Sequence, residues 1–173
     1  MDGKCTRRDD RSAWVEPMLL ARLDGRLWHA TSVAGLEGIL REGIIRPDAT
    51  TRHHAAYVRS IGAVSVFDLA EPDSGISIIA SHWSHWCRGE IATPYWLEID
   101  RAAVAGQYLD PRETLRRWRK RPEPDGTPET RLIANIEAAH VGPIPIASII
   151  DIVAVDDGRQ AELPTRFANW RSR

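Results

Sequence analysis

The sequence has little cysteine, no long apolar run and almost no net charge. Its two cysteines, Cys5 and Cys87, lie far apart, which argues against a disulfide framework or a four-cysteine zinc site. No apolar run approaches the roughly 18–20 residues that span a bilayer, and residues 1–12 lack the apolar core of a signal peptide. We therefore expect a cytoplasmic protein that does not bind membranes.

The charge balance also argues against one mode of binding. A formal net charge of −1 gives the chain no overall attraction to nucleic acid, so a polyanion would have to bind a local basic patch. With 173 residues, 43% of them hydrophobic, and no internal repeat, the chain fits a single globular domain. We expect residues 1–12 to be mobile and residues 13–173 to form this domain.

Short strands mixed with few helices predict an α+β fold. β-branched and aromatic residues favour strands, whereas apolar residues three and four apart favour helices. Besides a strand that ends at His29, we expect strands at 63–67, 94–100, 131–139 and 149–155. Helices are expected at 14–23, 76–88 and 101–105, with turns at 122–128 and 142–145 and a polar tail from 156 that includes Phe167 and Trp170.

The most informative stretch runs from Arg26 to Ile45. A short apolar run ends in His29-Ala30-Thr31-Ser32, and a helix follows that Ser32 can cap and Gly43 can end. His29 and Thr31 then lie at the end of a strand, beside a helix start whose free N–H groups favour anions. This arrangement suits a nucleotide or dinucleotide. The alternative is that His29 is a strand-end histidine that caps a turn.

Three segments share an order and spacing with a known family. They are His29-Ala30-Thr31-Ser32 with its helix, Val64-Ser65-Val66-Phe67, and Ile136-Glu137-Ala138-Ala139 followed by Gly142-Pro143-Ile144-Pro145. Over residues 26–155 they resemble the ADP-ribosyltransferase fold, the split β-sandwich of diphtheria-type toxins, poly-ADP-ribose polymerases and tRNA 2′-phosphotransferases. The first segment is most similar to bacterial and phage members. The third is similar to DNA-modifying toxins, in which a glutamate precedes Val/Ile-Pro by the spacing that separates Glu137 from Ile144 (144 − 137 = 7).

The resemblance implies a split β-sandwich with short flanking helices and a cleft that holds NAD as substrate. His29 would hydrogen-bond the nicotinamide ribose. A strand serine or a tyrosine would line the nicotinamide pocket. The residues implied to hold NAD are His29, Ala30, Thr31, Ser32, Tyr57 and Ser65.

The resemblance also implies two catalytic residues, His29 and Glu137. Cleavage of the nicotinamide–ribose bond builds positive charge on the ribose, so a fixed carboxylate stabilises the transition state as that charge develops. The glutamate can also act as base on the incoming nucleophile, while the histidine contributes by positioning. Glu129 is an alternative to Glu137, because it also stands at the start of a predicted strand segment. Either glutamate can instead be a solvated carboxylate at a strand edge.

Two other groups of residues compete for a functional role. His82, His85 and Cys87, with His53 and His54 upstream, offer nitrogen and sulfur ligands for a transition metal. Cys87 would point away from a helix face that carries both His82 and His85, so we expect no metal. Cys87 as a nucleophile beside either histidine has no supporting motif.

A basic stretch surrounds Trp118. Arg116, Arg117, Trp118 and Arg119 offer cations for phosphates and a ring for stacking on a base. The alternative is a solvated basic helix that is balanced by nearby acidic residues, namely Glu113, Glu123 and Asp125.

We therefore expect an NAD-dependent ADP-ribosyltransferase that modifies a macromolecule, with nucleic acid favoured over protein. A bacterial toxin or phage-related effector would fit so small a chain, and a toxin would imply a neutralising partner protein. Two alternatives stay open. One is an NAD-dependent RNA 2′-phosphotransferase, and the other is a non-catalytic module that binds nucleotide or nucleic acid.

Overall fold

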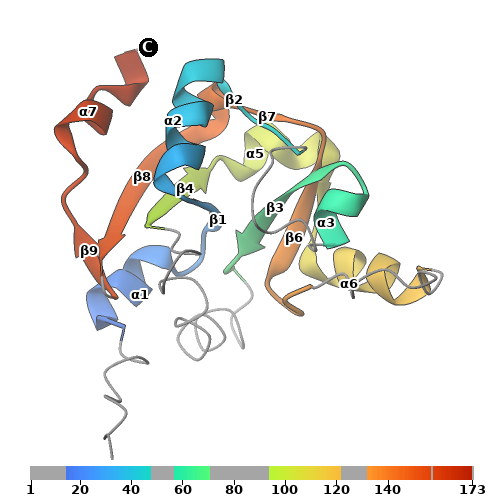
Figure 1. Cartoon of the computed structure of the whole chain (residues 1–173). Coiled ribbons are helices and arrows are strands. Elements are labelled where there is room, and N and C mark those ends of the chain that lie inside the picture. Colours follow the sequence, from blue (N-terminus) through green and yellow to red (C-terminus); the bar gives the residue numbers. More distant parts are fainter. Residues whose placement is uncertain (1–14, 48–56, 71–93, 122–131, 157, 173) are drawn as a thin grey trace, which may run out of the picture.

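The computed structural model describes residues 15–47, 57–70, 94–121, 132–156 and 158–172. These form a seven-stranded antiparallel sheet in the order β5-β6-β3-β1-β4-β8-β9, and a separate two-stranded ribbon of β2 and β7 (Figure 1). The α+β prediction is confirmed. The strands are β1 Leu27–Thr31, β2 Ile44–Ile45, β3 Ala63–Asp68, β4 Tyr95–Ile99, β5 Tyr108–Leu109, β6 Glu137–Val141, β7 Ile144–Pro145, β8 Ile149–Asp156 and β9 Arg159–Ala161.

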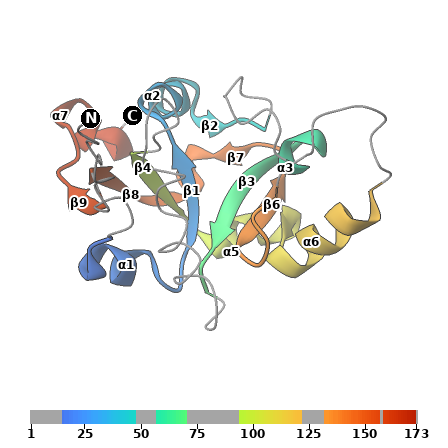
Figure 2. The same cartoon turned by 60° about the horizontal axis from the view of Figure 1, so that its bottom comes forward.

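Short helices flank the sheet (Figures 1 and 2). The α-helices are α1 Pro17–Leu23, α2 Val33–Glu42, α3 Tyr57–Ser60, α5 Arg101–Val104, α6 Pro111–Lys120 and α7 Thr165–Ala168, and the 3₁₀ turns are η3 Ala105–Gln107, η4 Ile146–Ser148 and η5 Trp170–Ser172. Among the described residues, no helix has the length and apolar character that a membrane crossing requires.

Apolar side chains pack on both faces of the sheet, as the alternation of β3 shows. Val64 and Val66 point to one face and join the core built on α2. On the other face, Ala63 packs in a small cluster with α3, and Phe67 packs against the cluster that includes α1. Ser65 therefore stands between two apolar clusters on this second face.

The helix that follows β1 forms as the sequence predicts. Ser32 caps α2 by accepting a hydrogen bond from the N–H of Gly35 at 3.1 Å, and Gly43 ends the helix in the left-handed region at φ 73°. Leu36, Ile39 and Leu40 are buried against the sheet. All of these assignments confirm the prediction for this segment.

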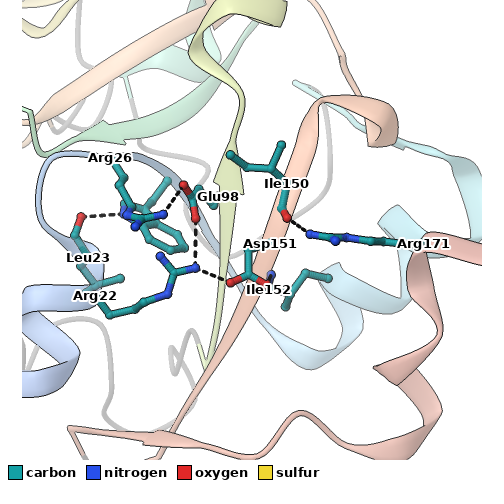
Figure 3. Close-up of polar contacts among 9 residues, drawn as sticks. Arg22, Leu23, Arg26, Glu98, Ile150, Asp151, Ile152 and Arg171 are labelled. Carbon is teal, nitrogen blue, oxygen red and sulfur yellow. Dashed lines mark hydrogen bonds and ion pairs between the residues drawn. The ribbon is translucent and has the colours of Figure 1, made fainter.

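A polar network holds α1 against β1, β4 and β8 (Figure 3). Glu98 is 6% exposed and pairs with Trp28 on the neighbouring strand β1 and with Asp151 on the neighbouring strand β8. Its carboxylate accepts hydrogen bonds from Arg22 at 3.0 Å and Arg26 at 2.7 Å, and Arg22 also donates to Asp151. Because two guanidinium groups neutralise one buried carboxylate, this network serves to dock α1 and the start of β1.

Several predicted boundaries are wrong. The strand predicted at 131–139 begins only at Glu137 and ends at Val141, because a turn with Asn135 at φ 71° interrupts the chain just before it. The turn predicted at 142–145 contains Gly142 at φ 84°, but Ile144 and Pro145 already pair with β2. The first helix begins at Pro17 rather than at 14, since proline favours the first helical position.

The remaining predictions are confirmed, corrected or lie outside the described residues. The strands expected at 63–67, 94–100 and 149–155 are confirmed as β3, β4 and β8 within a residue, and Asp100 caps α5. The tail is not only polar chain, since it contributes β9 and α7 and buries Phe167 and Trp170 in the core. The mobile segment predicted at 1–12, the helix predicted at 76–88 and the turn predicted at 122–128 lie outside the described residues.

Candidate active site

His29 lies where two neighbouring strands separate. β1 pairs with β3 only through Leu27↔Asp68 and Trp28↔Phe67, whereas β1 pairs with β4 as far as Thr31. Figure 2 shows β1 and β3 meeting at one end and diverging toward the other. Beyond the last pair, Nδ1 of His29 lies 2.9 Å from the carbonyl oxygen of Ser65. The imidazole thus bridges the opening between the strands, which we call the seam.

The contact with Ser65 defines the tautomer of His29. A carbonyl oxygen only accepts hydrogen bonds, so Nδ1 must carry the hydrogen, and Nε2 of the neutral ring keeps its lone pair. Burial lowers the pKa of His29, partly opposed by the bond to Ser65. At neutral pH the ring is therefore uncharged and Nε2 can accept a hydrogen bond from a ligand hydroxyl.

The closed end of the seam is held by a buried carboxylate. Asp68, opposite Leu27, is 5% exposed and accepts hydrogen bonds from Arg101 at 2.7 Å, from the Tyr108 hydroxyl and from the N–H of Ala70. These donors lower the pKa of Asp68 against the effect of burial. Asp68 therefore stays ionised and pins β3 to α5 and β5.

Glu137 is held by donors on both carboxylate oxygens. The hydroxyl of Ser65 donates to Oε1 at 2.7 Å, and the backbone N–H of Ile133 donates to Oε2 at 2.7 Å. In return, the N–H of Glu137 donates to the carbonyl oxygen of Ile133 at 3.0 Å. The turn around Asn135, which shortens the predicted strand, is what allows Ile133 to reach back to this carboxylate.

Burial sets the chemistry of Glu137. The residue is 5% exposed, and burial raises the pKa of its carboxyl group, while the bonds from Ile133 and Ser65 lower it in part. Ser65, its neighbour, lies between the two apolar clusters on this face of the sheet. A carboxylate with a raised pKa is a better proton acceptor near neutral pH than a solvated one. Because Glu137 is buried, its interpretation as a solvated strand-edge carboxylate is wrong.

Ser65 connects the two candidate catalytic residues. Its backbone carbonyl accepts from His29 on β1, and its side chain donates to Glu137 on β6. Strand alternation places His29 on the face of Leu27 and places Ser65 and Glu137 on the face of Phe67. The imidazole and the carboxylate therefore lie on opposite faces of the sheet, two strands apart, and are linked through Ser65 of β3.

The other residues expected to bind NAD lie at the end of β1, at the cap of α2 and at the start of α3. Ala30 and Thr31 form the end of β1, and Ser32 is occupied as the cap of α2. Tyr57 is 5% exposed at the start of α3 and packs in the cluster that contains Ala139, the residue opposite Ser65 on β6. The structure thus places both Tyr57 and Ser65 on the Glu137 face, and Thr31 toward α2.

The competing candidates lie outside the described residues, namely Glu129, His53, His54, His82, His85 and Cys87. Two hollows of about 330 and 380 Å³ are present among the described residues, and neither is lined by His29 or Glu137. The first lies between α2 and α7, and the second lies on α6.

The basic stretch forms α6, with Asp110 as its cap. Arg116 and Arg117 both pair with Glu113, and these bonds lower the pKa of Glu113 to about 2. Trp118 is partly buried against the Tyr57 cluster, and the guanidinium of Arg121 lies over its ring at 4.4 Å from the ring centroid.

Comparison of the chain with protein-family models, with curated proteins and with solved structures finds no match. We therefore infer a function from the residues of the chain and from their geometry. Sequence reasoning singled out His29, Ser65 and Glu137 but missed the backbone N–H of Ile133. The asparagine at 135, a residue that tolerates positive φ, was the available signal for that turn.

Proposed function

We propose that the chain is an NAD-dependent ADP-ribosyltransferase that modifies a macromolecular acceptor, with nucleic acid favoured over protein. The observation that carries the proposal is the link His29–Ser65–Glu137 across the adjacent strands β1, β3 and β6. All three residues are among the candidates that the family resemblance implies.

The chemistry divides between the two residues. The bond between nicotinamide and ribose breaks, and nicotinamide leaves with the bonding electron pair. Positive charge develops on the ribose, and the carboxylate of Glu137 stabilises it. The nucleophilic atom of the acceptor then bonds to the ribose carbon, and its proton passes to Glu137, whose raised pKa suits a base.

His29 acts by position rather than by charge. Its neutral ring presents Nε2 to a ribose hydroxyl while Nδ1 is anchored on β3. Orientation of this kind is effective because it removes rotational freedom before the reaction.

The test is NAD turnover by the purified chain. We expect nicotinamide release with NAD alone, and transfer of labelled ADP-ribose to nucleic acid when a cell lysate is added. His29→Ala should weaken NAD binding and turnover, and Glu137→Gln should abolish turnover while NAD binding is kept. Glu162→Gln, an exposed glutamate on the same fold, is the matched control and should leave turnover unchanged.

Three outcomes decide the proposal. Absence of NAD binding by calorimetry at millimolar ligand, with the protein folded, would show that it is wrong. Nicotinamide release that requires 2′-phosphorylated RNA would identify the phosphotransferase instead. Turnover that survives Glu137→Gln would remove the carboxylate from the mechanism.

A further inference from the structure

The exposed side of α6 carries a row of cations. Arg112, Arg116, Arg119 and Lys120 recur at three- and four-residue spacing around Leu115, and together they line the hollow of about 380 Å³. Pro111 and Thr114 are buried on the opposite side of the helix. We call these four residues the basic face of α6.

Helix stability does not explain the whole of this face. Cations in the last turn, such as Arg119 and Lys120, interact favourably with the helix dipole. Arg112 sits in the first turn, where the dipole disfavours a positive charge. Arg116 is paired with Glu113, which neutralises part of the charge of this face. The helix contains five basic residues against Glu113 alone, in a chain whose formal net charge is −1.

α6 packs on the face of the sheet that carries Glu137. Trp118 packs with Leu132 and Ala139 on the face of β6 that also carries Glu137. Leu132 precedes Ile133, the donor to that carboxylate. In Figures 1 and 2, α6 begins near β6 and extends away from it at an angle, with β3 next in the sheet. A polymer that binds α6 is therefore held on the side of the sheet that carries Glu137.

We propose that the basic face of α6 is the docking surface for the phosphodiester backbone of the acceptor nucleic acid, an inference that rests on the proposed function. Guanidinium groups bind phosphate oxygens through paired hydrogen bonds. Arg112 and Arg119 are about 10 Å apart along the helix axis, close to the rise of three nucleotides of one strand. Because Trp118 packs inward and is covered by Arg121, α6 reads phosphates and not bases.

Binding of labelled oligonucleotides, measured by fluorescence anisotropy, tests the docking surface. Single-stranded DNA, duplex DNA and single-stranded RNA of equal length are the three probes, each titrated between about 50 and 200 mM salt. Arg119→Gln/Lys120→Gln should weaken binding about tenfold at the lower salt and reduce the slope of log affinity against log salt by about two. Arg112→Gln should reduce that slope by about one.

The matched control removes two positive charges from a different part of the surface. Arg41 and Arg166 line the other hollow, between α2 and α7. Arg41→Gln/Arg166→Gln should leave the affinity and the slope close to those of the unmodified chain. Equal losses in the two double variants would overturn the proposal, because overall charge would then explain binding. Equal affinity for polyglutamate would overturn it too, because the surface would then accept any polyanion, including an acidic protein.

NAD turnover separates this inference from the proposed function. The α6 variants should release nicotinamide from NAD at the unmodified rate without acceptor, yet label the acceptor poorly. If the unmodified chain ignores NAD but still binds oligonucleotides through α6, the proposed transferase is wrong and the docking surface is right. If NAD turnover occurs but labelling does not respond to Arg112→Gln or Arg119→Gln/Lys120→Gln, only the docking surface is wrong.

Discussion

Glu137 accepts a 2.7 Å hydrogen bond from the hydroxyl of Ser65, although the two residues are 72 positions apart in the chain. The bond joins β3 to β6 on a face where Ser65 is bordered by apolar clusters. A hydrogen bond to an ionised group in such surroundings contributes about 1.5–3 kcal/mol. Ser65 therefore influences when Glu137 is ionised, and this can be measured.

Substitution of Ser65 should shift the pH dependence of catalysis. Ser65→Ala removes a donor that lowers the pKa of Glu137, so this pKa should rise further and the acid limb of kcat should move to higher pH. We expect a loss of about tenfold at neutral pH. Ser65→Thr keeps the hydroxyl and should retain the original profile. Because His29 contacts the backbone of Ser65, this contact should persist in both variants.

Glu137→Gln should make the protein more stable. The folded state holds a carboxyl group whose pKa is raised by burial, so its ionisation at neutral pH opposes folding. The amide can still accept from Ile133 and donate to the Ser65 hydroxyl oxygen. We expect a gain of about 1 kcal/mol at neutral pH by urea denaturation. The gain should shrink as pH falls through the folded pKa of Glu137, and a loss of stability at neutral pH would contradict this account.

Gly35→Ala should destabilise the protein, because α2 packs very closely on the end of β1. A Cβ at Gly35 would lie 2.1 Å from Oγ1 of Thr31, which is buried. We expect a loss of about 1–3 kcal/mol by urea denaturation, and Thr31→Ala should relieve most of it in the double variant. Gly38→Ala, in the same helix, meets only the end of Arg41 at 3.8 Å. This control should gain up to about 1 kcal/mol, and a similar gain for Gly35→Ala would contradict the close packing.

His29 should make the protein less stable in mild acid. Its pKa is lowered in the folded state, so the unfolded chain takes up a proton first, near pH 6.5. The contribution of His29 is thus complete above about pH 6.5 and is lost as pH falls toward the folded pKa. His29→Gln keeps a donor for the Ser65 carbonyl but does not titrate. The difference in unfolding free energy between the two proteins should therefore change with pH below about 6.5, and a constant difference would contradict a desolvated imidazole.

Local signals predicted the elements that carry the site. Ser32 and Gly43 mark the ends of α2 through their own hydrogen-bonding and backbone preferences, and both assignments are confirmed. Strands such as β4 and β8 were equally readable, because they are rich in aromatic, β-branched and aliphatic residues. The start of β6 was not predicted correctly, because a turn with Asn135 at positive φ interrupts the weak alternating pattern before it.

The order of residues along the chain was enough to predict an α+β fold, because strand and helix preferences act over a few residues. Through a family resemblance it also indicated His29, Ser65 or Tyr57, and Glu137 or Glu129 as candidates. Only the folded chain decided that β1 and β3 separate after Trp28 and that Ser65 joins imidazole to carboxylate. It also turned Trp118 inward and left the cations of α6 outside. These features depend on which strands become neighbours and on which side of a helix meets the sheet, and both are set by long-range packing of apolar surface.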